Sequence, residues 1–372
     1  MKALTELTSQ RTILIRFIGL TLLSVLSILP SYSQPDTTEV KHKDQKTPPR
    51  YISLFDSDDI LEISLSLDLA TFLKKTDKTQ AFDGELTFHF SETDSVDRNV
   101  TVKYRGMSRF ERCKFPPMRI SFKKPLYEGP DSGKIKNIKL VNPCQQGVAF
   151  EQYVIKEWLV YRLYNVVTDT SFRVRLLKVN LIDSENKRKP IDQYGIFIEP
   201  EDLLAERENI LEVKTRGLSQ RHMYPAMIDR VAIFNYMVSN WDWSVPGQHN
   251  VSVFTSPDPA QGGLGIPVPF DFDLTGVVNA EYAIPPPDLG IETNRDRMFT
   301  GICRTREEYR AALMDFLALK DEFYSVVNSC QYLSSPAKRD ITGFLDQFFD
   351  QFEKEKSLNS LIDLFLDSCK KL

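Results

Sequence analysis

Two acidic stretches in the second half of the chain contain the residue types that metal-dependent phosphate chemistry requires. The first, SNWDWSVPGQHN, includes Asp242 and Asn250. The second, PVPFDFDLTG, includes Asp271 and Asp273. Phosphoryl transfer needs a carboxylate that orients or deprotonates the acceptor, and oxygen ligands that hold Mg²⁺ on the phosphates. The two stretches contain both kinds of group.

The segment between the two stretches predicts a hairpin that brings them together. NVSVF predicts a strand, SPDPAQGGLG a Gly-rich turn, and IPVPF a second strand that ends just before Asp271. This order matches kinase-like sites, in which an Asp and an Asn share one loop and a metal-binding Asp follows a short hairpin. The interval from Asp242 to Asn250 is eight residues, whereas the eukaryotic kinase loop has about five. The pattern therefore excludes a standard protein kinase.

Each part of this set also has a simpler interpretation. An Asp-x-Asp triplet such as the one that ends at Asp273 also binds Mn²⁺ or Mg²⁺ in sugar-nucleotide transferases, or only caps a turn. Trp241 and Trp243 are of a type that more often fills a core than contacts a substrate. His249 is explained equally well by a structural hydrogen bond and by catalysis. The ordered set as a whole favours a metal-dependent site.

The elements that would position these residues change character near residue 200. Before that point, alternating apolar residues predict strands in GELTFHF, RNVTVKYRG, MRISF, IKNIKLV, RVRLLKVNLID and QYGIFIE. One amphipathic helix, AFEQYVIKEWLVYRLYN, interrupts them. After residue 200, PAMIDRVAIFNYMVSN predicts a helix that leads into the first acidic stretch, and REEYRAALMDFLALKDEFYSVV, AKRDITGFLDQFFDQFEKE and SLNSLIDLFLDSCKKL predict three closing helices. This order predicts an α+β protein with a strand-rich lobe, 51–200, and a helical lobe, 201–372.

The first 33 residues have the pattern of a cleavable signal peptide. Basic residues precede an apolar run, Phe17–Leu29, that is too short to span a bilayer comfortably, and Ser31 and Ser33 precede a predicted cleavage before Gln34. We therefore expect an exported chain, periplasmic or extracellular, with a flexible polar leader over 34–50. No second apolar run of about twenty residues follows, so we expect no membrane span after cleavage.

Charge and cysteine content exclude several classes of protein. The formal net charge is −4, so the chain lacks the basic surface expected of a protein that binds nucleic acid or an anionic membrane. The five cysteines form no CxxC motif or Cys/His cluster, which argues against a structural zinc site. In an oxidising compartment one or two disulfides can form, and the odd number leaves at least one thiol.

Several motifs resemble those of the CotH-type spore-coat protein kinases, a divergent branch of the kinase-like superfamily. They are KYRGMSRF, YGIFIEPEDLL, SNWDWSVPGQHN and VPFDFD. The sequence is more similar to an uncharacterised exported group of Gram-negative bacteria, through RCKFPPMRISF, KLVNPC, EWLVYRLYN, DWSVPGQHN and PVPFDFDLTGVVNAEYAIP. The resemblance covers about residues 51–350. It implies a two-lobed atypical protein-kinase-like fold of the α+β class.

The resemblance also implies roles for the residues of the two acidic stretches. Asp242 matches the catalytic carboxylate that handles the acceptor hydroxyl. Asn250 and Asp271 match metal ligands, and Asp273 matches a second-metal ligand. The implied cofactors are Mg²⁺ or Mn²⁺ and ATP or another nucleotide.

For the nucleotide site the resemblance is less specific. Glu199 matches the acidic residue that ends the segment between the lobes. Glu157 either pairs with the cation that holds the phosphates or is a solvated helix residue. The candidates for that cation are Lys103, Arg105, Lys114 and Arg119.

Three functional hypotheses follow. The leading one is an exported atypical kinase that transfers phosphoryl from a Mg-nucleotide to a hydroxyl group of a protein or glycan. The second is a catalytically inactive kinase-fold protein that binds a partner in the envelope or at the surface. A metal-dependent glycosyltransferase that uses Asp271 and Asp273 is the weakest, because no alternation of strands and helices typical of a sugar-nucleotide domain is visible.

Cys113 and Cys144 both recur in the pattern of the exported group and lie beside predicted strands. The resemblance therefore favours a disulfide between them. Two buried thiols are the alternative.

Overall fold

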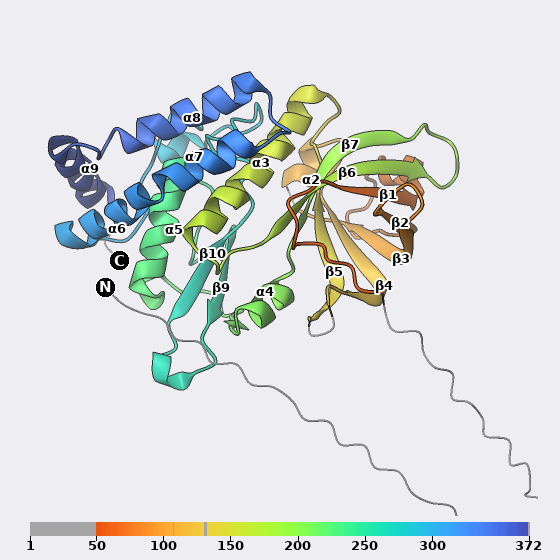
Figure 1. Ribbon diagram of the computed structural model, residues 1–372, viewed down its shortest axis with the longest axis horizontal. Coiled ribbons are helices and arrows are strands. Elements are labelled where there is room, and N and C mark those ends of the chain that lie inside the picture. The colour runs from red at the N-terminus through yellow and green to blue at the C-terminus, as the bar shows by residue number, and fades with distance from the viewer. Residues whose placement is uncertain (1–49, 107, 130–131, 371–372) are drawn as a thin grey trace, which may run out of the picture. The chain divides into compact units, whose positions relative to one another are not determined.

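The computed structural model describes residues 50–372, apart from 107, 130–131 and 371–372 (Figure 1). The predicted signal peptide, 1–33, lies outside the described residues, as does the predicted leader, 34–50, except for Arg50. Within the part of the chain that is described, no helix is both long enough and apolar enough to cross a membrane.

Seven strands form a closed barrel in the order β1-β2-β3-β4-β5-β7-β6. All neighbours are antiparallel except β1 and β6, whose parallel pairing runs from Leu61 opposite Leu177 to Leu67 opposite Asp183. This parallel pairing closes the sheet. The strands are β1 (Leu61–Leu67), β2 (Ala81–His89), β3 (Ser95–Tyr104), β4 (Met118–Tyr127), β5 (Lys134–Val141), β6 (Val174–Asp183) and β7 (Ile191–Ile198).

Alternating side chains fill the inside of the barrel. In β1, Leu61, Ile63, Leu65 and Leu67 are all buried, while the residues between them are exposed or half-buried. Because successive side chains of a strand point to opposite faces, this alternation sends one apolar set inward on each strand. The barrel therefore has an apolar core of its own, and its outer wall carries polar and charged side chains.

The expectation of a two-lobed kinase-like fold is wrong. The strand-rich half is a closed mixed barrel rather than the open sheet of such a lobe. The predicted strands occur where the alternating patterns place them, but closure depends on the pairing of β1 with β6, which are far apart in the sequence. A period-two pattern specifies which face of a strand is buried, and it does not specify whether the outermost strands meet.

Most helices lie beside the barrel, together with a small sheet of strand order β10-β9-β8 (Figure 1). Helix α3 contacts β6 and β7 of the barrel on one side and α5 and α7 on the other. The elements of this part are α3 (Val148–Val167), β8 (Leu211–Glu212), α5 (Pro225–Val238), β9 (Val251–Thr255), β10 (Gly265–Pro269), α6 (Arg306–Ala318), α7 (Lys320–Ser329), α8 (Ser335–Phe349) and α9 (Glu355–Ser368). Three short helices complete the fold: α1 (Leu69–Phe72), α2 (Ser108–Arg112) and α4 (Glu201–Arg207).

A second apolar core joins α3 to the helices that follow it. Aromatic side chains are frequent in this core, and the rings of Tyr164 and Phe234 lie 4.8 Å apart. The segment from 306 to 327 is predicted as one helix but forms two, α6 and α7. The break allows both Phe316 and Phe323 to reach the core, where their ring centres are 6.1 Å apart.

Two disulfides are present. The predicted Cys113–Cys144 bond is confirmed, and a second bond joins Cys303 to Cys369. Cys330 remains as a buried free thiol. Both bonds favour an oxidising environment for the folded chain, because disulfides are rare where thiols are kept reduced.

The filled barrel predicts a large cost for truncating an inward side chain. Leu65 is fully buried inside the barrel, so Leu65→Ala should lower the free energy of unfolding by about 2–5 kcal/mol. Glu62→Ala, on the exposed outer face of the same strand, should change it by less than about 1 kcal/mol. Denaturant unfolding of both variants tests this, and equal effects would contradict a closed, filled barrel.

Candidate functional site

The first acidic stretch begins where α5 ends. Ser239 adopts a left-handed conformation with φ 54° and terminates the helix. The Asn240 side chain donates to Asn235 Oδ1 at 3.0 Å and accepts from the Asp242 backbone N–H at 3.0 Å. The end of the buried helix therefore fixes the backbone at Asp242.

Within this stretch, Asp242 is held by two neighbours. Its Oδ1 lies 2.8 Å from His249 Nε2, and its Oδ2 accepts from Asn250 Nδ2 at 3.0 Å. Asn250 Nδ2 also donates to the Asp242 backbone carbonyl at 2.8 Å. Because both bonds use the amide nitrogen, Asn250 keeps its side-chain oxygen for another partner. Trp243 is buried in the core, as its residue type predicts.

The β9–β10 hairpin brings Asp271 to Asn250, as the sequence predicts. Val251 is opposite Pro269 in the register, and the Phe270 backbone N–H donates to the Asn250 carbonyl at 2.9 Å. Asn250 and Asp271 both have left-handed backbones, with φ 54° and 63°, which Asn and Asp tolerate better than most residues. Asn250, just before β9, and Asp271, just after β10, therefore lie side by side at the two ends of the hairpin.

Helix α3 supports the other side of the second acidic stretch. The Tyr161 hydroxyl accepts from the Asp271 backbone N–H at 2.8 Å, and its ring centre lies 4.8 Å from that of Phe272. Glu157, one helical turn before Tyr161, is almost fully buried, and its Oε1 has no hydrogen-bond partner within the described chain. The interpretation of Glu157 as a solvated helix residue is therefore wrong.

Four carboxylates form what we call the acidic cluster: Asp242, Asp271, Asp273 and Glu157. Burial, together with Asp271 and Asp242, raises the pKa of Asp273 to about 7, although Arg109 opposes the shift. Burial, Asp273 and Asp271 also raise the pKa of Glu157, and Arg109 and Arg105 oppose this shift. Burial is the largest cause of both shifts, and the neighbouring carboxylates add to it, so a bound cation would favour the ionised forms of these groups.

The acidic cluster fits a hard cation that also binds a ligand. Among the residues described, no three His, Cys, Asp or Glu side chains are placed to hold a metal ion by themselves. Mg²⁺ typically uses one or two carboxylates and takes its remaining ligands from water and substrate phosphates. The Asp271 carboxylate, which forms no hydrogen bond or ion pair within the described chain, and the available amide oxygen of Asn250 are donors of this kind.

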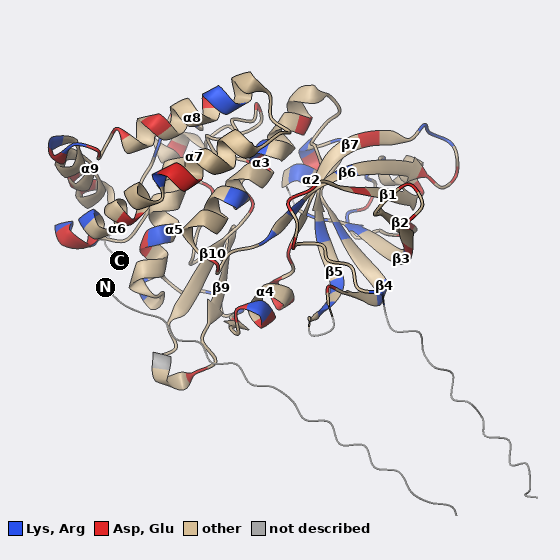
Figure 2. Ribbon diagram, in the orientation of Figure 1, with Lys and Arg blue, Asp and Glu red and all other residues tan. Residues whose placement is uncertain are grey.

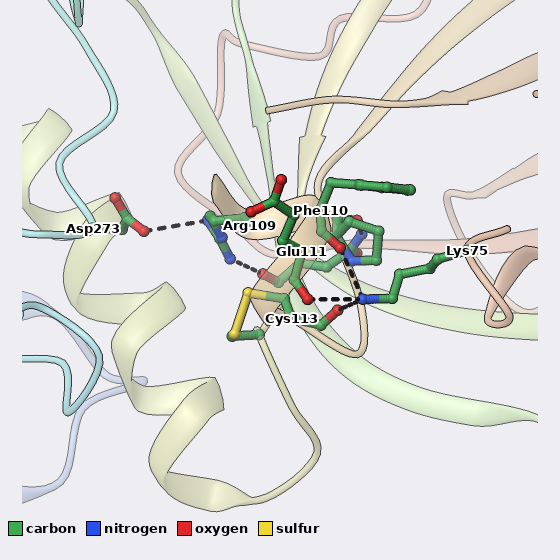
Figure 3. Close-up of a disulfide and its surroundings, with 9 residues drawn as sticks. Lys75, Arg109, Phe110, Glu111, Cys113 and Asp273 are labelled. Atoms are coloured by element: carbon green, nitrogen blue, oxygen red, sulfur yellow. Dashed lines mark hydrogen bonds and ion pairs between the residues drawn. A yellow bond between two sulfur atoms is a disulfide. The ribbon is translucent and has the colours of Figure 1, made fainter. Parts of the chain in front are cut away.

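Arg109 lies beside the acidic cluster, although the sequence analysis does not select it. It extends from α2, and its Nη1 lies 3.7 Å from Asp273 Oδ2 (Figure 3). Its Nη2 donates to the Asn142 carbonyl at 2.6 Å. Tyr282 is a second neighbour of Asp273 that the analysis misses. Both lie in quoted motifs, KYRGMSRF and AEYAIP, but an Arg-rich stretch does not indicate which arginine turns inward.

Three cations, which we call the cation row, lie side by side on the outer wall of the barrel. Lys103 of β3 is opposite Arg119 of β4, which is opposite Lys139 of β5, and Figure 2 shows basic segments on these neighbouring strands. Like charges directly opposite destabilise a sheet. Lys139 is ion-paired with Glu201, but the side chains of Lys103 and Arg119 have no hydrogen bond or ion pair within the described chain. The row therefore carries spare positive charge.

The cation row meets the hairpin at Phe270. Lys139 Nζ lies 5.0 Å from the centre of the Phe270 ring. Phe270 directly precedes Asp271 in the chain. Burial lowers the pKa of Lys139, and Arg105 and Arg119 lower it further, against the opposing effect of Glu201. Arg105 also acts on the pKa of Glu157, so its charge affects both the cation row and the acidic cluster.

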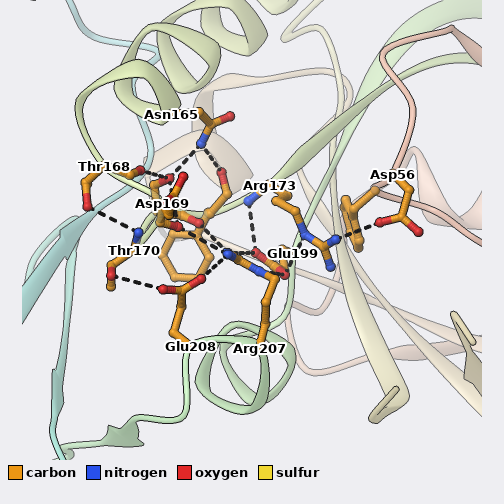
Figure 4. Close-up of polar contacts among 12 residues, drawn as sticks. Asp56, Asn165, Thr168, Asp169, Thr170, Arg173, Glu199, Arg207 and Glu208 are labelled. Atoms are coloured by element: carbon orange, nitrogen blue, oxygen red, sulfur yellow. Dashed lines mark hydrogen bonds and ion pairs between the residues drawn. The ribbon is translucent and has the colours of Figure 1, made fainter. Parts of the chain in front are cut away.

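Two predicted nucleotide-binding residues lie elsewhere. Lys114 is exposed, and its Nζ donates to Gln146 Oε1 at 3.2 Å. Glu199 is fully buried and accepts bonds from Arg173 and Arg207, with lengths of 2.9 to 3.1 Å (Figure 4). Both carboxylate oxygens of Glu199 are therefore occupied by arginines that join the barrel to α4. The structure does not bring Lys114 or Glu199 to the acidic cluster.

A surface hollow of about 790 Å³ lies away from the acidic cluster. It lies against the outer face of β1, β6 and β7, and its polar side chains largely satisfy one another. Ser64 Oγ lies 2.9 Å from His89 Nε2, and Asn180 donates to Asp192. Volume alone does not make this hollow the functional site.

Comparison with protein-family models and with curated proteins gives no match for this chain.

The acidic cluster predicts an unusual pH dependence of stability for the metal-free protein. Asp273 has a pKa of about 7 in the folded chain against an ordinary value of 3.8, so between these values the folded state keeps a proton that the unfolded state has lost. This group alone should lower the free energy of unfolding by roughly 1 kcal/mol per pH unit as the pH rises from about 4 to about 7. Asp273→Asn should remove this contribution.

Denaturant unfolding in the presence of a chelator, from pH 4.5 to 8, measures the slope. Asp367→Asn, which changes an exposed carboxylate on α9, is the matched control and should keep the wild-type slope. Identical slopes for wild type and Asp273→Asn would show that folding does not raise the pKa of the Asp273 carboxyl.

Proposed function

We propose that this protein transfers a phosphoryl group from a metal-bound nucleotide to a hydroxyl group of a protein or glycan. The observation that carries the proposal is the meeting of Asp242, Asn250 and Asp271 at the ends of one hairpin, with Arg105 and the cation row nearby. The resemblance of the motifs to CotH-type kinases favours the same activity. The proposal does not depend on a kinase fold, since function resides in the site and not in the architecture.

The metal would be held by Asp271 and by the side-chain oxygen of Asn250, with Asp273 as a second carboxylate. When bound, Mg²⁺ or Mn²⁺ supplies positive charge that neutralises the phosphate oxygens. The crowding of carboxylates supports this assignment, because a divalent cation would offset the repulsion from Asp271 and Asp242 that, after burial, raises the pKa of Asp273.

The phosphates would bind to Arg105 and Arg119. Of the four cations that the resemblance suggests, these are the two whose charges lower the pKa of Lys139. Neither side chain has an ion-pair partner among the described residues. A guanidinium group binds two phosphate oxygens at once, which suits it to this role. Lys114 is not part of the proposal, since it contacts Gln146 instead.

Asp242 would act on the acceptor. Its carboxylate is oriented by His249 and Asn250 and takes the proton of the acceptor hydroxyl. The hydroxyl oxygen then forms a bond to the γ-phosphorus as the bond from that phosphorus to the β-phosphate oxygen breaks. The products are a phosphate ester and a nucleoside diphosphate.

We place this activity outside the cytoplasm. The N-terminal signal-peptide pattern motivates export, and the two disulfides support it. Peptide mapping of the native protein should then find Gln34 as the first residue.

The two halves of the site predict different defects. Asp242→Asn should leave Mg-nucleotide binding almost unchanged, since this carboxylate faces the acceptor, while the transfer rate falls by a factor on the order of 10²–10⁴. Asp271→Asn should weaken metal-dependent nucleotide binding itself, because it removes a charged ligand from a hard cation. Calorimetric titration of ATP at fixed Mg²⁺, with melting temperatures as a check on folding, separates the two.

The alternatives give other outcomes. Selective binding of UDP- or GDP-sugars would favour a glycosyltransferase. Absence of metal-dependent binding of any nucleotide would favour a binding protein without catalysis. Equal ATP affinity for Asp271→Asn and wild type would remove Asp271 from the metal site and with it most of the support for phosphoryl transfer.

A further inference from the structure

Arg109 is the cation whose side chain comes closest to the acidic cluster among the described residues, yet it extends from a weak element. Helix α2 has five residues and buries none of them. A helix this short is not stable by itself, because few backbone bonds compensate for the ordering of its residues. The position of Arg109 must therefore come from contacts outside the helix.

Those contacts converge on the residues just after α2. The Cys113 backbone N–H donates to the Arg109 carbonyl at 2.9 Å, and the Lys114 N–H donates to the Cys144 carbonyl at 2.8 Å. Lys75 Nζ donates to the carbonyls of Phe110 and Cys113 at 2.8 and 2.7 Å (Figure 3). The only covalent tie among them is the Cys113–Cys144 bond.

The same bond leads to the acceptor of the Arg109 side chain. Arg109 Nη2 donates to the carbonyl of Asn142, two residues before Cys144. Asn142 is itself fully buried and fixed on both sides, since it donates to the Pro116 carbonyl at 3.2 Å and accepts from Gln193 at 3.0 Å. The disulfide therefore joins the segment that carries Arg109 to the segment that orients its guanidinium group.

The other end of this segment leads directly to Glu157. Helix α3 begins at Val148, four residues after Cys144, and carries Glu157 into the acidic cluster. Arg109 has two buried nitrogens without hydrogen-bond partners, Nε and Nη1, and Nη1 faces Asp273. A buried guanidinium is costly when its carboxylate partner is displaced, so its alignment with the cluster has to be maintained by the surrounding structure.

We propose that the Cys113–Cys144 disulfide is a positioning device for Arg109, and that Arg109 in turn holds Asp273 ready to bind the metal. Arg109 is a positioning residue that acts through Asp273 and does not itself touch the ligand. The part of the inference that concerns metal binding rests on the proposed function. The part that concerns the position of the side chain does not.

Variants of the full chain test the metal-binding part, with Mn²⁺ as the probe. Cys113→Ala/Cys144→Ala and Arg109→Gln should each weaken Mn²⁺ affinity on the order of tenfold, and their combination should be little worse than either. Arg109→Lys should recover part of the loss. Cys303→Ala/Cys369→Ala, the matched control, removes the other disulfide, which ties α9 to residue 303, and should bind Mn²⁺ as the wild type does while melting at a lower temperature.

A readout without ligand separates this inference from the proposed function. The Arg109 Nε–H, identified by its absence in Arg109→Gln, should give a slowly exchanging ¹⁵N NMR signal in wild type and in the Cys303/Cys369 control. It should exchange fast or disappear in Cys113→Ala/Cys144→Ala. If that variant does not fold, the same signal is measured in native protein that has been partly reduced with a phosphine. Mass spectrometry then identifies which disulfide was broken.

The outcomes are distinct. Loss of the NMR signal without any Mn²⁺ binding in wild type would keep the positioning role and refute the metal site. Persistence of the signal after removal of the Cys113–Cys144 bond would overturn the inference, as would additive losses of Mn²⁺ affinity in the combined variant.

Discussion

The burial of Glu157 and Asp273 beside Asp271, with Arg109 ion-paired to Asp273, is the constraint on which the rest of the site depends. Burying a carboxylate is costly unless it is paired or gives up its charge, and Arg109 is the only Lys or Arg with an ion pair to the cluster within the described residues. The chain accommodates this cost through its backbone. Helix α3 supplies the Tyr161 hydroxyl that fixes Asp271, and the Cys113–Cys144 bond ties the Arg109 segment to the start of that helix.

The barrel contributes a rigid wall rather than a reaction centre. Its interior is apolar and filled, so its functional residues lie on the outer face, where Lys103, Arg119 and Lys139 share one register. A closed sheet keeps that register, because no edge strand can slip. The like charges of the row are unfavourable for the sheet alone. Under the proposed function they would form one half of an anion site, with the proposed metal at the hairpin as the other half.

Much of this arrangement can be predicted from the sequence. The strands, α3, α5 and the β9–β10 hairpin follow from local periodicity, and the hairpin predicts that Asn250 and Asp271 meet. Closure of the barrel does not follow, because the pairing of β1 with β6 is non-local. Arg109 and Glu199 illustrate a second limit. Nothing in the local pattern distinguishes the arginine that turns toward Asp273 from its neighbours, or shows that Glu199 is occupied by Arg173 and Arg207.

The central claim is that the acidic cluster binds a metal together with a nucleotide. Isothermal titration of ATP into the purified chain, with Mg²⁺ and then with a chelator, tests it most directly. Our account predicts saturable binding with Mg²⁺ that is lost with the chelator and that falls steeply in Asp271→Asn. Binding that is the same with and without metal, or no binding in either condition, would contradict it.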